Sequence, residues 1–133
     1  KSVAGSVLPL GATINMDGTA LYLGILALFT AQAFGYDLTF MNYVMIALTA
    51  AIVSIGAAGI PSASLFLLAI VLQTFDVSPE HTAIIVGFIL PVDRIMDMAR
   101  TAVNVTGDAA VATAVAKWEG ELDEDVFRAP AKV

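Results

Sequence analysis

Six polar side chains recur on one side of a mostly apolar stretch near the C-terminal end of the chain. The stretch reads PVDRIMDMARTAVNVTGD, and the six residues are Asp93, Asp97, Arg100, Thr101, Asn104 and Asp108. On an α-helix, at about 100° per residue, they fall within an arc of roughly 100°. Ionisable groups in such surroundings are costly unless they are paired, hydrated or holding an ion. The stripe is therefore predicted to be a binding site for a charged ligand.

The rest of the composition indicates that this helix lies in a membrane. Hydrophobic residues make up 59% of the 133 residues and charged ones 14%, and the mean hydropathy is +0.87. Soluble domains contain about 45–50% apolar and about 25% charged residues. No charged residue lies between Gly18 and Tyr36 or between Leu38 and Phe75. We expect an all-α membrane protein whose segments cross the bilayer two to four times, given about 20 apolar residues per span.

Half of the net charge of −6 comes from the C-terminal tail, residues 120–133, and the residue just before it. Five of the twelve acidic residues lie there: Glu119, Glu121, Asp123, Glu124 and Asp125. We expect this tail to be a solvated helix end or a disordered segment. The chain has no basic cluster, so nucleic acid is not an expected partner. It has no Cys, which excludes thiolate metal sites and disulfides.

Residues 1–35 form the first element that must position the stripe, and they predict a helix broken in its middle. Apolar sequence loses its regularity at GATINMDGT, where Gly, Asn and Asp are poor helix formers. Helix resumes over Tyr22–Phe34. Because the polar residues of the break cluster together, we expect an unwound segment there.

Residues 42–76 predict a re-entrant hairpin with its lead-in rather than two spans. Two short apolar segments, 42–55 and 65–75, flank the sequence GAAGIPSAS, in which Gly and Pro interrupt any helix. Irregular backbone at membrane depth survives only where protein or a water-filled cavity satisfies its polar groups. Short or Gly-interrupted apolar segments are the best sequence indication of a secondary transporter's binding site.

Residues 82–119 predict the long final helix, which carries the stripe and ends at an interfacial Lys117-Trp118 pair. His81 lies just before it in a polar turn, where we expect it to be exposed. The chain begins with Lys1 and without a signal-like basic region. We interpret it as the C-terminal part of a longer protein.

Three motifs in this order resemble the glutamate/aspartate transporter family, the dicarboxylate/amino acid:cation symporters. They are NMDGT (residues 15–19), SIGAAGIP (54–61) and DMARTAVNVTGD (97–108). The resemblance implies that residues 1–119 are the C-terminal half of a transport domain of an inverted-repeat, elevator-type transporter. Residues 1–35 would be broken transmembrane helix seven, residues 42–76 the second re-entrant hairpin and residues 82–119 transmembrane helix eight. It further implies a multi-pass homotrimer in the lipid bilayer of the inner (plasma) membrane, and no enzymatic activity.

The resemblance also implies how an acidic amino acid substrate is bound. Arg100 would bind the substrate's side-chain carboxylate and Asp97 its α-ammonium, with Asp93 orienting Arg100. The remaining substrate contacts would come from Thr101, Asn104, Thr19 and the hairpin tip Gly59, Ile60, Pro61 and Ser62. Ser62 and Ser64 stand where many family members have glycine. The alternative for Arg100 is a pair with Asp97 or Asp93 that only neutralises the helix, and for Thr101 a hydrogen bond to the preceding turn.

The same resemblance implies sodium as the coupling ion and no other cofactor. One sodium site would comprise Gly11, Asn15, Asn104 and Asp108, since hard cations prefer oxygen ligands. A second would use backbone oxygens of Thr13, Met16, Ser54, Ile55 and Ala57. A third, incomplete in this chain, would be built around Asp17 and Thr19; the alternative for Asp17 is a helix N-cap. Asp108 favours sodium, because proton-coupled relatives often have Asn there.

The main functional prediction is a sodium-coupled symporter for L-aspartate or L-glutamate. A proton-coupled glutamate symporter or a C4-dicarboxylate symporter of the same family is the near alternative. An intramembrane aspartyl hydrolase is disfavoured, because its two carboxylates must face each other across a water, whereas here the aspartates share one helix. A non-transporting structural fragment would not explain the stripe.

Overall fold

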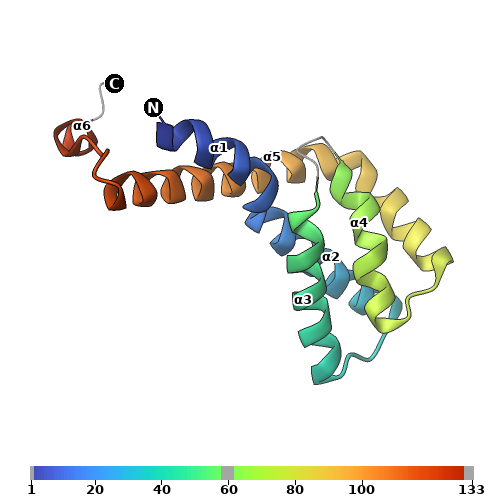
Figure 1. Cartoon of the computed structure of the whole chain (residues 1–133). Helices are drawn as coiled ribbons and strands as arrows, with labels where there is room; N and C mark the ends of the chain where they lie inside the picture. Colours follow the sequence, from blue (N-terminus) through green and yellow to red (C-terminus); the bar gives the residue numbers. More distant parts are fainter. Residues whose placement is uncertain (1, 58–61, 131–133) are drawn as a thin grey trace.

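The computed structural model describes residues 2–57 and 62–130, and within them every regular element is helical (Figure 1). Five α-helices and a 3-10 turn precede a short C-terminal helix. In chain order the elements are α1 (Ser2–Ile14), α2 (Asp17–Phe34), α3 (Phe40–Ile55), α4 (Ala63–Leu72), η1 (Gln73–Phe75), α5 (Pro79–Trp118) and α6 (Glu124–Arg128).

The long helix α5 is the element on which the others are arranged. Its two halves have different neighbours: α1 runs along the C-terminal half, while α2 and α4 contact the N-terminal half (Figure 1). Helices α3 and α4 contact each other, and both contact α2. Side chains of α5 therefore meet residues from α1, α2 and α4 at successive heights along one helix.

The break between α1 and α2 is shorter than the sequence predicts. Only Asn15 and Met16 lie between the two helices, and Gly11 and Thr13 are helical. Glycine's low helix propensity is a weak preference that tertiary packing overrides, and α1 is packed along α5. Asp17 is the first residue of α2 rather than its N-cap, which is Met16. Its carboxylate is favourably placed at the positive end of the helix dipole.

The other helix ends follow from local sequence. Gly35 closes α2 in the left-handed region, at φ 71°, which glycine adopts without steric cost. Thr39 and Asn42 form a reciprocal capping box that starts α3. Ser78 caps α5, with Pro79 at the first helical position. The α3 and α5 starts lie within three residues of the predicted ones.

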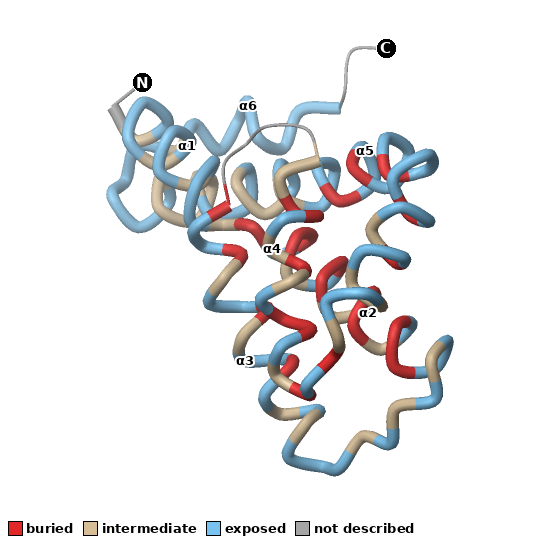
Figure 2. Tube along the Cα trace, turned by 90° about the vertical axis from the view of Figure 1, so that its right-hand side faces the viewer, coloured by how far each residue is buried: buried red, intermediate tan, exposed pale blue. Residues whose placement is uncertain are grey.

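One buried stripe on α5 changes character along the helix. It comprises Ile85, Ile89, Asp93, Asp97 and Arg100. The two isoleucines join an apolar core formed mainly by α2 and α4, where Leu23, Leu68 and Leu72 are fully buried. Figure 2 shows the buried residues gathered where α2, α3, α4 and α5 meet, and α6 entirely exposed. The three charged residues continue the same face beyond that core.

His81 is not the exposed turn residue that the sequence predicts. Its ring stacks on Phe34 with 4.0 Å between centroids, and its Nδ1 lies 2.8 Å from the hydroxyl of Tyr36. That hydroxyl also accepts a hydrogen bond from the backbone N–H of Ser78 at 3.3 Å. The turn after α2 is thus tied to the start of α5. The contact between His81 and Tyr36 was not predicted, because 45 residues separate the two side chains in sequence.

By length and composition, one stretch of the described chain can cross a membrane, namely Val3–Phe34. Phe40–Ile55 and Ala63–Phe75 are apolar but shorter. The tail contains the exposed helix α6, whose Arg128 binds Glu124 at 2.9 Å.

The closest approach of α2 to α5 yields a test of the fold. A Cβ on Gly18 would fall on the backbone carbonyl of Arg100, whereas a Cβ on Gly24, in the same helix, meets nothing within 4 Å. Overpacking against backbone costs about 1–3 kcal/mol. We expect Gly18→Ala to lower the thermal unfolding midpoint of the purified complete protein, and Gly24→Ala to leave it unchanged or raised, since Ala favours helix. Equal midpoints for the two variants would contradict this packing.

Candidate functional site

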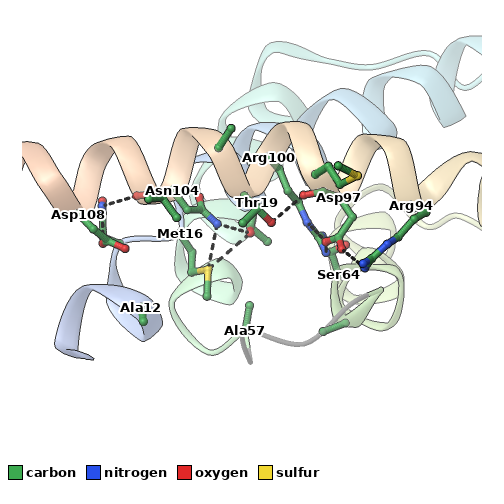
Figure 3. A pocket seen from close by; sticks show the side chains of 16 residues that line it. Ala12, Met16, Thr19, Ala57, Ser64, Arg94, Asp97, Arg100, Asn104 and Asp108 are labelled. Atoms are coloured by element: carbon green, nitrogen blue, oxygen red, sulfur yellow. Dashed lines mark hydrogen bonds and ion pairs between the residues drawn. The ribbon is translucent and has the colours of Figure 1, made fainter. Parts of the chain in front are cut away.

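A cavity of about 670 Å³ lies against α5 and is lined by side chains of α1, α2 and α4 and by Ala57, just after α3 (Figure 3). Its walls come from both sides of the α1–α2 break, the end of α3, the start of α4 and the polar stripe. The lining residues are Ala12, Asn15, Met16, Thr19, Ala57, Ala63, Ser64, Arg94, Asp97, Met98, Arg100, Thr101, Ala102, Asn104, Val105 and Asp108. The charged residues lie at two levels, Arg94 to Arg100 near one end and Asp108 near the other (Figure 3).

Arg100 is buried and held on two sides. Its Nε donates to Oδ1 of Asp97 at 2.9 Å, and its Nη2 donates to the same oxygen. Its Nη1 donates to Oγ of Ser64, at the start of α4. The guanidinium carbon lies 5.4 Å from the centre of the Tyr22 ring, a favourable cation–π distance. Arginine stays charged at any depth, so these contacts stabilise a permanent cation in the cavity wall.

The contacts of Arg100 leave two of its N–H donors available. A guanidinium carries five N–H donors, and the described hydrogen bonds engage one on each nitrogen. One N–H remains on Nη1 and one on Nη2. Such charged donors bind the oxygens of carboxylates strongly. The pairing with Asp97 is the neutralising arrangement that the sequence left open, yet it does not exhaust the binding capacity of Arg100.

The second oxygen of Asp97 faces a different arginine. Oδ2 accepts from Nη1 of Arg94 at 3.4 Å, a long contact. The Arg94 side chain is 68% exposed and that of Asp97 is 10% exposed. Thr101 lines the same level, but its hydroxyl donates to the backbone carbonyl of Asp97 at 2.7 Å. This is the hydrogen bond to the preceding turn that is common for threonine in a helix, and the substrate role of Thr101 stays a prediction.

Asp93 does not contact Arg100 directly, as a side chain that orients it would. It is 1% exposed, and its Oδ1 accepts from the hydroxyl of Tyr22 at 2.7 Å. Its Oδ2 has no hydrogen-bond partner in the described part of the chain. Because the ring of Tyr22 lies beneath Arg100, Tyr22 connects Asp93 to Arg100. Tyr22 was not predicted as part of the site, because 71 residues separate it from Asp93 in sequence.

The other end of the cavity brings together the residues predicted for the first sodium site. Asn15 donates to Oδ1 of Asp108 at 3.0 Å and to the backbone carbonyl of Asn104 at 3.3 Å. The carboxylate of Asp108 lies so close to Gly11 that a Cβ there would overlap it. The side-chain oxygen of Asn104 accepts from the backbone N–H of Gly18 at 2.7 Å. The break and α5 thus concentrate polar oxygens in one place.

Between the two ends, a small cluster joins the break to the stripe. The side-chain nitrogen of Asn104 lies 3.2 Å from the sulfur of Met16 and 3.4 Å from the hydroxyl of Thr19. Thr19 and Met16 are both buried. Asn104 therefore contacts the break through both ends of its amide, which fixes the amide's orientation. The substrate role of Thr19 stays a prediction.

The residues predicted for the other two ion sites are only partly gathered. Met16 and Ala57 line the main cavity, whereas Thr13, Ser54 and Ile55 do not. Asp17 borders a separate open pocket of about 430 Å³ with Thr106 and Gly107, so Asp17 and Thr19 face different spaces. In the part of the chain that the structure describes, no three acidic or histidine side chains cluster around one point. An ion here would depend on carbonyl and amide oxygens in addition to a single carboxylate.

Of the four residues predicted to form the hairpin tip, the structure describes Ser62. Gly59, Ile60 and Pro61 lie outside the described residues. Ser62 is half-buried and adopts the left-handed region, at φ 61°, just before α4. That conformation is one that glycine adopts without steric cost. Ser64, which the sequence analysis did not assign to the site, is 1% exposed and contacts Arg100.

Comparison with known proteins identifies the family. The model of the sodium:dicarboxylate symporter family matches residues 1–118. The chain is 45% identical over 120 residues to a proton/sodium-glutamate symport protein of Bacillus subtilis, covering 90% of the chain and 27% of the relative. It is 43% identical over 125 residues to a C4-dicarboxylate transport protein of Rhodospirillum rubrum, covering 94% and 27%.

An animal relative matches as well. The chain is 48% identical over 109 residues to excitatory amino acid transporter 3 of Mus musculus, covering 82% of the chain and 20% of the relative. The chain spans less than a third of the length of the curated relatives that it matches. The matched region contains all three motifs that suggested the resemblance.

The contact between Tyr22 and Asp93 yields a test of the site's support. Tyr22→Phe keeps the ring beneath Arg100 but removes the hydrogen bond to a buried carboxylate. Leaving such a group unsatisfied costs about 1–3 kcal/mol. We expect the thermal unfolding midpoint of the complete protein to fall, while Tyr43→Phe, at a half-exposed tyrosine of α3, leaves it unchanged. Equal midpoints for the two variants would show that the hydrogen bond does not support the site.

Proposed function

The chain belongs to the sodium:dicarboxylate symporter family, and we propose that it forms the C-terminal part of a transporter that couples sodium influx to uptake of L-aspartate or L-glutamate. The protein is a transporter rather than an enzyme, since its curated relatives are named as symporters and transporters. The observation that carries the proposal is the pairing of Arg100 with Asp97 in the same cavity as the Asn15–Asp108 cluster.

The substrate proposal follows from the charges at the first level of the cavity. An acidic amino acid carries a side-chain carboxylate and an α-ammonium. The remaining N–H donors of Arg100 can bind the carboxylate. Oδ2 of Asp97, whose contact to Arg94 is long, can accept a hydrogen bond from the ammonium. Both partners are already held in place by contacts within the protein, which reduces the entropy lost on binding.

The ion proposal follows from the oxygens at the second level. Asp108 supplies a carboxylate, and Gly11 and Asn104 supply carbonyl oxygens next to the α1–α2 break. Asn15 already binds both Asp108 and the Asn104 carbonyl. Sodium, a hard cation, suits such a set of oxygens. Asp108 lies eight residues after Arg100, about 12 Å along the helix, so ion and substrate would bind at different heights of α5, with Asn104 between them.

The remaining features of the proposal concern the whole protein. Residues 1–119 would be the C-terminal half of its transport domain, with residues 120–133 as an acidic tail. The transport domain would move by an elevator mechanism in a multi-pass homotrimer of the inner (plasma) membrane. A homologous region of 118 residues in a family of symporters supports this assignment.

A second candidate is a proton-coupled glutamate symporter or a C4-dicarboxylate symporter. It is favoured by the relatives' names, because proteins of both kinds match this chain at similar identity. The two candidates differ in the ion that drives uptake and in the requirement for a substrate amine. Both differences are measurable in one assay.

Uptake of labelled L-aspartate by proteoliposomes that contain the complete protein tests the proposal. We expect accumulation under an inward sodium gradient and none when choline replaces sodium. Accumulation driven equally well by an inward proton gradient without sodium would select the second candidate. No accumulation of aspartate or glutamate under either gradient would refute the substrate class.

Asp108→Asn tests the proposed ion site in the same assay. The substitution keeps the size of the side chain but removes its charge, which is expected to weaken sodium binding. The sodium concentration for half-maximal uptake should rise by roughly tenfold or more, as loss of about 1.4 kcal/mol would require. An unchanged sodium dependence would remove Asp108 from the ion site.

A further inference from the structure

Asp97 is flanked by two arginines that differ in burial. Arg94 precedes it by three residues and Arg100 follows it by three, so that all three lie close on the α5 surface. Arg100 holds Oδ1, and its side chain is 7% exposed. Arg94 approaches Oδ2 at 3.4 Å, and its side chain is 68% exposed. One arginine is thus fixed in the cavity wall, while the other lies at the rim.

Arg100 holds Oδ1 of Asp97, whereas Oδ2 has only the long contact to Arg94. Oδ2 is therefore the oxygen for which Arg94 and a substrate ammonium can compete. Arg100 can bind a substrate carboxylate with its remaining N–H pair while it keeps Oδ1 of Asp97. What then varies between substrates is the partner of Oδ2. A substrate with an ammonium can supply one. A dicarboxylate without an amine cannot, and it would leave one oxygen of a buried carboxylate without a close partner, which is unfavourable.

Arg94 is placed to take that role. Its long side chain is mostly in solvent, it lines the cavity, and it already lies near Oδ2. A shift of a few tenths of an ångström would bring the contact to an ordinary charge-assisted distance of about 2.8 Å. Conversely, its present contact is long and exposed and therefore weak. An incoming ammonium can displace it at little cost.

We propose that Arg94 sets how strictly the site requires a substrate amine. It competes with the substrate ammonium for Oδ2 of Asp97, and it neutralises Asp97 when the substrate has no amine. Arg94 is thereby a specificity-determining residue that shifts the site toward C4-dicarboxylates. The inference rests on the proposed function, in which Asp97 receives the substrate amine and Arg100 the carboxylate.

Succinate and L-aspartate provide the matched probe, because succinate is aspartate without its amine. The measured quantity is the ratio of the succinate to the aspartate inhibition constant, taken from competition with labelled aspartate uptake by the complete protein. We expect Arg94→Gln to raise this ratio by roughly three- to tenfold, in keeping with an ion pair that is exposed at one end. Arg94→Lys, which keeps a cation at the position, should preserve the ratio within about twofold.

Arg128→Gln is the control for the loss of an exposed arginine. Arg128 is 73% exposed and pairs with Glu124 in α6, away from the cavity, and its removal should leave the ratio unchanged. If wild type and Arg94→Gln show the same ratio while both transport aspartate, the role of Arg94 is refuted and the proposed function stands. If succinate does not compete in the wild type, the role is likewise refuted. If the wild type transports neither aspartate nor glutamate, the proposed function falls, and the inference falls with it.

Discussion

A buried arginine that cannot lose its charge is the constraint on which the site depends. Arg100 sits where the apolar stripe of α5 turns charged, and it must be stabilised there by the protein. Asp97 supplies the counter-charge from the same helix, Ser64 a hydrogen-bond acceptor from α4, and Tyr22 an aromatic face from α2. Removing one partner of a buried pair costs about 3–5 kcal/mol. The charge of Arg100 thereby couples the polarity of the cavity to the packing of α2 and α4 against α5.

The α1–α2 break serves the second level of the cavity in a similar way. Asn15 lies in the two-residue gap, from which its side chain reaches both Asp108 and the Asn104 backbone. Gly18 and Gly107 allow the break and α5 to approach at distances that a Cβ would prevent. The two helices are therefore joined by polar contacts as well as by close backbone packing. An ion-binding role for this level would explain why amides and a carboxylate are placed where apolar side chains would pack more simply.

Periodicity made the polar stripe, the long final helix and the hairpin helices predictable, because each depends on local sequence. The turn at Gly35 and the caps at Thr39 and Ser78 also form between neighbouring residues, although the caps were not predicted. The partners of the stripe were not predictable. Tyr22, Ser64 and His81 acquire their roles from contacts with residues 36 to 71 positions away, and no local pattern records such distances. The width of the break was overestimated for a related reason, since packing of α1 on α5 keeps Gly11 helical despite its weak propensity.

Arg100 and Asp97 are proposed to recognise an acidic amino acid together, without separating from each other. An experimental structure of the complete protein with bound L-aspartate and sodium would test this proposal. We expect the substrate's side-chain carboxylate on the Nη1 and Nη2 donors of Arg100, its ammonium within hydrogen-bond distance of Oδ2 of Asp97, and the contact of Arg100 with Oδ1 of Asp97 intact. A substrate that contacts neither residue, or whose ammonium lies away from Asp97, would contradict it.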